Sequence, residues 1–216
     1  MSRIDELVER LCPDGVEYKR FDEVCSLHAR IGWQRLTKKE QLPSGDYMLI
    51  TGTDFTSTHT VNYKTCVYVE KERYEQDKNI QLKDGDVLIT KDGTLGKVAV
   101  VSHLPMPATL NGGVFVVRDV SGRMNNRFIA HFLLSTHFSK TVEMLSTGST
   151  ISHLTQKLFS RLRIPVPPME VQEEIVRVLD SFAELEAELE AELEARKAQY
   201  AYYRDKLLTF KEKTTG

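Results

Sequence analysis

The sequence predicts an α+β protein, with a mixed α/β domain over residues 1–167 followed by one long coiled-coil helix over residues 168–216. Short β-rich runs separated by turn residues fill the region from residue 47 to residue 117. Helical periodicity appears only after residue 125, and the C-terminal region keeps a continuous apolar seam. Strands first and helices afterwards favour an α+β fold over a wound parallel sheet.

Five short runs from residue 47 onwards are predicted to be strands. They either alternate apolar and polar side chains or concentrate β-branched ones, as strands do. Turn-forming groups such as Asp84-Gly85, Asp92-Gly93 and Asn111-Gly112-Gly113 separate the later runs. The predicted strands cover residues 47–51, 65–69, 86–90, 97–101 and 113–117.

Helices are predicted in the second half of the domain. Apolar side chains recur at helical spacing between residues 125 and 145. A second short helix is expected from Ser152, because Leu154 and Leu158 lie one turn apart.

A proline-rich segment, residues 164–168, separates the domain from the long helix. Its last residue, Pro168, suits the first position of a helix, and the glutamates Glu170, Glu173 and Glu174 suit the positive end of the helix dipole. The helix is expected to run to about residue 211, a length of ~60 Å at 1.5 Å per residue.

The long helix carries apolar residues in alternating steps of three and four, which indicates a coiled coil with one stutter at Leu189–Leu193. The stutter falls in an internal repeat, residues 184–195, where the tetrad Glu-Leu-Glu-Ala occurs three times. A solvated acidic helix is the alternative, but it would have no reason to keep a seam. Nothing else in the chain is long enough to pair with this helix, so we expect dimerisation through Ile175, Val178, Phe182, Leu185, Leu189, Leu193, Tyr200, Tyr203 and Leu207.

The charge is unevenly distributed along the 216 residues, although the net charge is only −2. Residues 1–168 carry 22 basic and 19 acidic side chains, a balance of +3, whereas residues 169–216 carry 7 and 12, a balance of −5. The acidic helix therefore masks a mildly basic domain, and the whole-chain charge does not exclude nucleic-acid binding.

The cysteine pattern and the hydropathy of the sequence indicate in which cellular compartment the protein is expected. Cys12, Cys25 and Cys66 form no CxxC pair, which fits a reducing cytoplasm and argues against a cysteine-built zinc site. No apolar run approaches the length of a membrane span, and the N-terminus has no signal-peptide core. We expect a cytoplasmic protein without a membrane partner.

No motif predicts catalysis, a metal site or a cofactor. Residues 92–97 resemble a phosphate-binding loop, but Lys91 and Val98 occupy positions where that motif needs Gly and Ser or Thr. A tight turn between strands is the better interpretation. The nuclease-like pattern Pro13-Asp14 with Glu17-Tyr18-Lys19 has its carboxylates too close in sequence, and we interpret it as a turn entering a strand.

Three stretches with basic residues and no acidic ones are candidates for DNA contact: residues 24–39, 93–118 and 144–169. Arg, Lys, Gln and Asn read base edges, and Lys and hydroxyl side chains suit phosphates. Ordinary surface charge is the alternative for any single residue. The predicted DNA-binding residues are Arg30, Trp33, Gln34, Arg35, Lys38, Lys39, Thr90, Lys91, Thr94, Lys97 and Asn111.

Several segments resemble the specificity (S) subunits of type I restriction–modification enzymes. Thr-Gly-Ser-Thr-Ile-Ser-His-Leu at 147–154, the proline segment 164–168 and Gln-Glu-Glu-Ile at 172–175 resemble the junction between a target recognition domain and the long helix. Residues 14–24 resemble the start of such a domain, and residues 196–210 the end of the helix in a subfamily with tetrad repeats.

The resemblance implies a subunit that reads double-stranded DNA without catalysing a reaction. It would dock methyltransferase (M) subunits, which methylate adenine, and restriction (R) subunits. The family usually has two recognition domains and two helices, whereas this chain has one of each. A half-subunit, natural or truncated, is thus implied, which would homodimerise through antiparallel helices and read a split target. A coiled-coil dimeric regulator without enzyme partners is the alternative, and an enzyme with an unrecognised site is a third.

Overall fold

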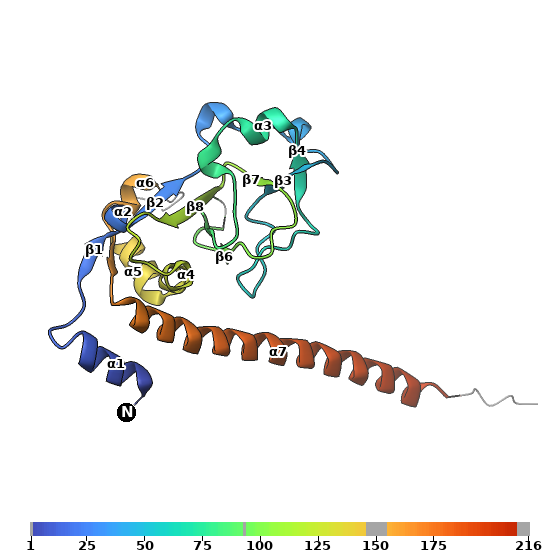
Figure 1. The fold of residues 1–216 in the computed structure, drawn as a ribbon. Coiled ribbons are helices and arrows are strands. Elements are labelled where there is room, and N and C mark those ends of the chain that lie inside the picture. The colour runs from blue at the N-terminus through green and yellow to red at the C-terminus, as the bar shows by residue number, and fades with distance from the viewer. Residues whose placement is uncertain (1, 93, 146–154, 211–216) are drawn as a thin grey trace, which may run out of the picture. The chain divides into compact units, whose positions relative to one another are not determined.

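The computed structural model describes residues 2–92, 94–145 and 155–210 (Figure 1). The chain divides into two compact units, Met1–Val176 (unit 1) and Arg177–Gly216 (unit 2). Unit 1 holds the strands and the shorter helices. Unit 2 consists of the greater part of the long helix α7 (Met169–Leu208), whose first two turns belong to unit 1.

The central sheet of unit 1 has four antiparallel strands. Its order is β2 (Cys25–His28), β8 (Val114–Asp119), β5 (Val87–Thr90) and β6 (Val98–Val100). The register pairs Leu27 with Val117 and Ile89 with Phe115. Strand β8 therefore lies between β2 and β5.

Two smaller sheets complete the strands in the described part of the chain. The three-stranded sheet has the order β4 (Val67–Val69), β3 (Tyr47–Ile50) and β7 (Ala108–Leu110), with β3 and β7 parallel. The two-stranded sheet joins β1 (Tyr18–Arg20) to β9 (Arg163–Pro165). It brings the start of the domain beside the segment that leads into α7.

The helices of unit 1 are short. They are α1 (Arg3–Leu11), α2 (Phe21–Val24), α3 (Lys71–Glu75), α4 (Asn126–Leu134), α5 (Thr136–Leu145) and α6 (Gln156–Phe159), with 3₁₀ turns at Gly32–Gln34, Lys38–Glu40 and Lys78–Ile80. No helix among the described residues is both long enough and apolar enough to cross a membrane.

The four-stranded sheet is buried on both faces. Side chains alternate along each strand, so Val87 and Ile89 of β5 face one core cluster while Leu88 faces another. The first cluster packs the sheet against α4, α5 and α6, and the second packs it against β3 and β7. A continuous apolar run in β5 follows from this double burial.

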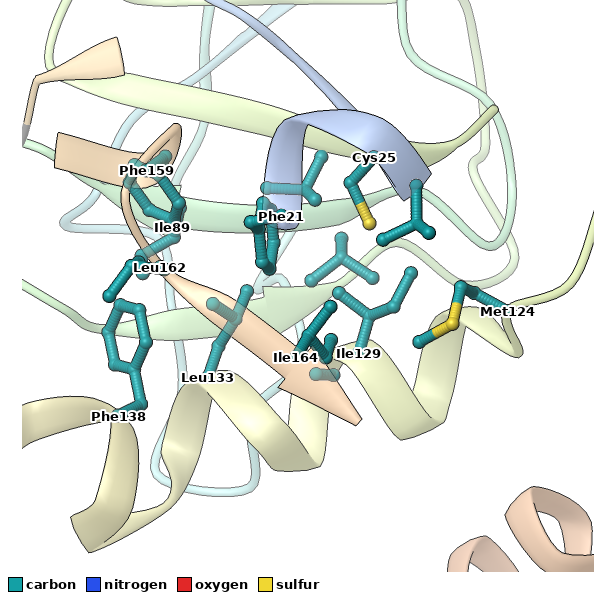
Figure 2. Packing of buried hydrophobic residues seen from close by; sticks show 14 of the residues in the cluster. Phe21, Cys25, Ile89, Met124, Ile129, Leu133, Phe138, Phe159, Leu162 and Ile164 are labelled. Atoms are coloured by element: carbon teal, nitrogen blue, oxygen red, sulfur yellow. The ribbon is translucent and has the colours of Figure 1, made fainter. Parts of the chain in front are cut away.

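Aromatic rings fill the first cluster (Figure 2). The Phe159 ring centre lies 5.3 Å from that of Phe21 and 6.0 Å from that of Phe138. Phe21 and Phe159 are fully buried, and each such side chain contributes about 1.5–3 kcal/mol. The cluster fixes α6 against the sheet, which matters for the site described below.

The predicted α+β fold is confirmed, and the five predicted strands correspond to β3, β4, β5, β6 and β8. One difference concerns residues 125–145, which form two helices. Ser135 is extended, and its hydroxyl accepts a hydrogen bond from the backbone N–H of Phe138, so it ends α4 and caps α5. The short helix α6 begins after the N-cap Thr155, and the predicted start at Ser152 lies outside the described residues.

The junction with α7 is held by one buried side chain. Gln172 is fully buried; its oxygen accepts from the N–H of Asn125 at 2.8 Å, and its amide donates to the carbonyls of Arg123 and Pro167, both at 2.8 Å. Three hydrogen bonds to backbone thus attach the first turn of α7 to unit 1. This gives a physical reason for a glutamine just after the proline segment.

Candidate nucleic-acid interface

Two loops meet at one edge of the four-stranded sheet because of its strand order. β2 and β5 both pair with β8 and both run antiparallel to it, so both end at the same edge. The loop that follows β2 begins at Ala29, and the loop that follows β5 begins at Lys91. We call them the β2 loop (residues 29–41) and the β5 loop (residues 91–97).

A cavity of about 660 Å³ lies at this edge. Its lining comes from both loops, from Phe115 on β8 and from the start of α6. Arg35 and Lys91, two of the predicted DNA-binding residues, share this lining although 56 positions separate them in sequence. The Lys91 ammonium lies 5.1 Å from the centre of the Phe115 ring. The structure thus brings two of the predicted segments together.

The cavity also contains groups that the basic pattern did not indicate. Asp77, Asp92 and Gln156 line it beside Arg35 and Lys91. Gln156 belongs to the stretch 144–169 that the sequence singled out, whereas a search for basic residues passes over the two aspartates. The result is a concave surface with both donors and acceptors of hydrogen bonds, which suits base edges better than phosphates alone.

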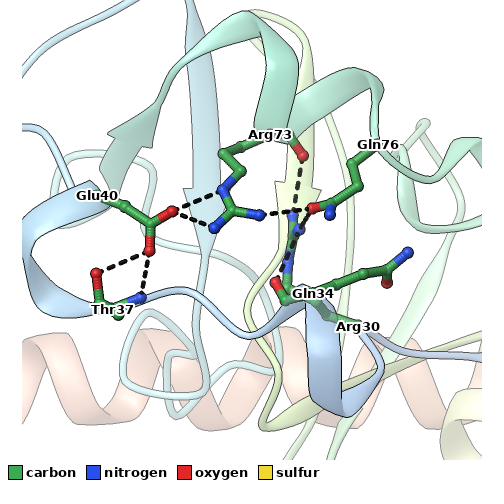
Figure 3. Close-up of polar contacts among 6 residues, drawn as sticks. All are labelled: Arg30, Gln34, Thr37, Glu40, Arg73 and Gln76. Atoms are coloured by element: carbon green, nitrogen blue, oxygen red, sulfur yellow. Dashed lines mark hydrogen bonds and ion pairs between the residues drawn. The ribbon is translucent and has the colours of Figure 1, made fainter.

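Arg30, one of the predicted DNA-binding residues, is only 2% exposed, although it forms part of the cavity lining. Its guanidinium donates to the carbonyl of Leu110 at 3.0 Å, to the Thr109 hydroxyl at 3.3 Å and to the carbonyl of Arg73 at 3.2 Å. It also donates to the side-chain oxygen of Gln76 at 3.0 Å (Figure 3). Burial, and secondly the charge of Arg73, lowers the pKa of Arg30. Arg30 positions the β2 loop against α3 and β7.

A second set of contacts holds the distal part of the β2 loop (Figure 3). Glu40 accepts from the N–H and hydroxyl of Thr37 at 2.8 and 2.7 Å, and from the Nε of Arg73 at 2.7 Å. These bonds from Thr37 and Arg73 lower the pKa of Glu40 to about 2. The turn Lys38–Glu40 is thereby fixed, and Lys38 and Lys39 stay exposed on it.

Two further predicted DNA-binding residues, Gln34 and Thr90, are also buried, at 4% and 3% exposure. The Gln34 side chain accepts from the N–H of Ile31 at 3.3 Å. The Thr90 hydroxyl donates to the carbonyl of Thr94 at 2.5 Å and accepts from the N–H of Lys97 at 2.9 Å. Both side chains thus hold the backbone of their loops in place.

The other predicted residues are accessible to different degrees. Arg35, Lys38, Lys39, Thr94 and Lys97 are exposed. Lys91 and Asn111 are half-buried, and the side-chain oxygen of Asn111 accepts from the N–H of Gly112 at 2.7 Å. The side chain of Trp33 lies outside the part of the chain that the structure describes.

Metal-ligating side chains and thiols are two kinds of group whose arrangement bears on chemistry in the described parts of the chain. No set of three or more His, Cys, Asp or Glu side chains there is arranged to hold a metal ion. Cys12, Cys25 and Cys66 are free and buried, and burial raises the pKa of the Cys25 and Cys66 thiols to about 12. A thiol with such a pKa is a poor nucleophile near neutral pH.

Comparisons with known proteins identify the family. The model for the type I restriction modification DNA specificity domain matches residues 13–195 of this chain. A protein of Haemophilus influenzae described as a type I restriction enzyme specificity subunit is 39% identical over 184 residues, 82% of this chain and 44% of that protein. The EcoKI specificity subunit of Escherichia coli is 26% identical over 148 residues, 67% of this chain and 32% of that protein.

Solved structures share the fold. A chain of a type I restriction–modification system, solved in a study of its assembly and conformational transition, has a TM-score of 0.65 at 20% identity, covering 93% of this chain and 48% of that chain. The HsdS subunit of Thermoanaerobacter tengcongensis has a TM-score of 0.59 at 19% identity, covering 87% and 44%. The fold of this chain is therefore shared by a part, somewhat less than half, of each of these two chains.

The chain belongs to the family of type I restriction–modification DNA specificity domains. The predicted resemblance is confirmed. The chain spans less than half the length of the Haemophilus influenzae and EcoKI relatives.

Mutation of the two arginines of the β2 loop should affect the free energy of unfolding to very different extents. Arg30→Ala leaves the carbonyls of Leu110 and Arg73 without a buried donor, and we expect it to lower the free energy of unfolding by about 2–4 kcal/mol. Arg35→Ala removes an exposed side chain and should change stability by less than about 0.5 kcal/mol. Urea denaturation of both variants measures the difference. Equal small losses would contradict the positioning role of Arg30.

Proposed function

We propose that this chain is the DNA sequence-specificity element of a type I restriction–modification enzyme, acts in the cytoplasm and has no active site of its own. Unit 1 binds double-stranded DNA, and α7 pairs antiparallel with α7 of a second copy. The homodimer docks M subunits, and R subunits where the system has them. The single observation that carries the proposal is the meeting of the β2 and β5 loops at one cavity in a chain of this family.

The DNA-binding surface consists of the cavity and its exposed basic surroundings. Lys38 and Lys39 stand on the fixed turn of the β2 loop, and Lys97 ends the β5 loop. Exposed lysines of this kind bind phosphates and set the orientation of the protein on the duplex. Arg35 reads base edges in the major groove, a role supported by its position in the cavity lining beside Asp77 and Asp92.

Homodimerisation is supported by the apolar side chains of α7 in unit 2. Phe182, Leu185, Leu189 and Leu193 are 62%, 53%, 65% and 54% exposed. Large apolar side chains at coiled-coil spacing are expected to be covered by a second helix. The first residue of the predicted dimer seam, Ile175, packs against the first core cluster of unit 1, so the pairing surface has its main extent from Val178 onwards.

The triple variant Arg35→Ala/Lys91→Ala/Lys97→Ala tests the DNA face. Loss of each phosphate-contacting lysine should weaken binding to all sequences alike and lower the slope of log affinity against log salt by about one. Loss of a base-reading arginine should cost about 1–3 kcal/mol on the cognate site and relax specificity. Together we expect at least about a tenfold loss of affinity, measured by fluorescence anisotropy over a salt series on cognate and random duplexes.

The matched control removes three exposed lysines that do not line the cavity, Lys64, Lys71 and Lys140. It changes the net charge by the same amount, so a general electrostatic effect would appear in both variants. Equal affinities of the two triple variants would show that DNA binds elsewhere.

The role as a specificity subunit is tested by co-expression with an M subunit encoded beside it. Co-purification followed by sequencing of methylated genomic adenines should show one split, palindromic target. A stable DNA-binding dimer that associates with no methyltransferase would instead support a regulator.

A further inference from the structure

The amino-acid sequence at the centre of α7 is palindromic. Residues 183–195 are Ala-Glu-Leu-Glu-Ala-Glu-Leu-Glu-Ala-Glu-Leu-Glu-Ala, with Leu189 in the middle. The apolar spacing continues the symmetry, because steps of four, three, four and three lead away from Leu189 on either side. Those steps reach Ile175 in one direction and Tyr203 in the other. Leu189 also lies at the middle of the helix Met169–Leu208.

Such symmetry defines one register for an antiparallel pair. If a two-fold axis passes through Leu189, a residue that lies n positions after Leu189 faces the partner residue that lies n positions before the partner's Leu189. Leu189 then meets the partner's Leu189, and Leu185 meets the partner's Leu193. Every seam position from Ile175 to Tyr203 faces another seam position, whereas Leu207 would face the partner's Val171, which is buried, and stays outside the paired layers. A shift by one turn would misplace the outer layers, because their steps alternate.

The layers outside the repeat distinguish antiparallel from parallel pairing. Position 196 in the seam is Arg196, and a parallel pair in register would place it against the partner's Arg196. Two guanidinium groups in one apolar layer are strongly unfavourable. In the antiparallel register Arg196 faces the partner's Phe182, where it can lie over the aromatic ring.

The same comparison holds for the next layers. Val178 faces the partner's Tyr200, so a smaller side chain meets a larger one, and the partner's Tyr203 stands opposite Ile175, which packs partly against the first core cluster. A parallel pair would stack Tyr on Tyr at two layers and leave Val on Val at another. The glutamates of the repeat repel one another in either orientation and therefore do not decide between them.

We propose that a second copy of this chain covers the α7 seam in this single register, with the two-fold axis at Leu189. The inference rests on the proposed homodimer and specifies its geometry. The seam side chains Leu185, Leu189 and Leu193 are more than half exposed in the single chain, which leaves them available to this occupant.

Three single cysteine variants test the register. Leu189→Cys places the two thiols on the axis, where mild oxidation should give a covalent dimer. Leu185→Cys and Leu193→Cys alone should not, because each thiol lies eight residues, or about 12 Å, from its own copy along the coil. Mixing and refolding the Leu185→Cys and Leu193→Cys chains should restore the cross-link in the mixed dimer. The native chain is the control, since its three cysteines are buried.

Light scattering on the same unoxidised samples separates the possible failures. A dimer in which all three variants cross-link to themselves would have parallel helices and would overturn the register while leaving the homodimer intact. The Leu189→Cys variant could be a dimer and still fail to cross-link, both by oxidation and with a bismaleimide shorter than 12 Å. The two-fold axis would then lie elsewhere, and the proposed register would be overturned. A monomer would overturn both this inference and the proposed homodimer, and would point to a helix of another subunit as the occupant.

Discussion

The double variant Leu185→Lys/Leu189→Lys is expected to be monomeric under conditions in which the native chain is a dimer. The two leucines lie at the centre of the exposed seam of α7, and four of these side chains would be buried in each dimer. Burial of a leucine is worth about 1.5–3 kcal/mol, so the dimer loses at least about 6 kcal/mol, or roughly four orders of magnitude in dissociation constant. Light scattering over a dilution series measures the change.

The matched control is Ala187→Lys/Ala191→Lys. It adds the same two charges to the same repeat, but on positions two residues from each leucine and therefore on the opposite face of the helix. We expect this variant to stay dimeric, because the added lysines also relieve repulsion among the glutamates. If both variants dissociate, charge density and not the seam controls association.

Three of the four strands of the central sheet, β5, β6 and β8, were predictable from the sequence because this sheet is buried on both faces. β5 and the first four residues of β8 are apolar or β-branched, and this signal stands out between glycine-containing turns. β7 was not predicted, because its three residues directly follow the proline-containing segment 105–107, which favours a turn over a strand. Helix α1 was not predicted, although the capping box formed by Ser2 and Asp5 is a sequence pattern that marks the start of a helix.

The candidate site was predictable only in outline. A pattern of basic residues located the β2 and β5 loops, but it could not separate Arg30, which is buried, from Arg35, which is exposed. The partners that bury Arg30 lie between 4 and 80 positions away, and only the folded sheet brings Leu110 and Thr109 to it. Charge in a sequence shows that a partner is needed, and the partner can be DNA or the protein's own backbone.

Insertion of one further Glu-Leu-Glu-Ala unit into residues 184–195 is expected to widen the gap between the two half-sites of the target. In the proposed antiparallel dimer each recognition domain stands at the N-terminal end of its own α7, so the length of the helix sets the distance between domains. Four residues add ~6 Å at 1.5 Å per residue. This corresponds to roughly two base pairs at 3.4 Å each, or one if the coil or the DNA bends.

The insertion should preserve both the dimer and the bases that are read. A repeat of four tetrads still reads the same in both directions, with the axis moved from a leucine to the alanine between two leucines, so all seam layers keep their counterparts. Insertion of only Glu-Ala is the contrasting variant, because it turns the following seam by about 200° and should break the pairing. Sequencing of methylated adenines, with the M subunit co-expressed, reports the target of each variant. A gap of unchanged length in a dimer that carries the extra tetrad would mean that the repeat does not set the spacing, whereas altered half-site bases would mean that it acts on recognition itself.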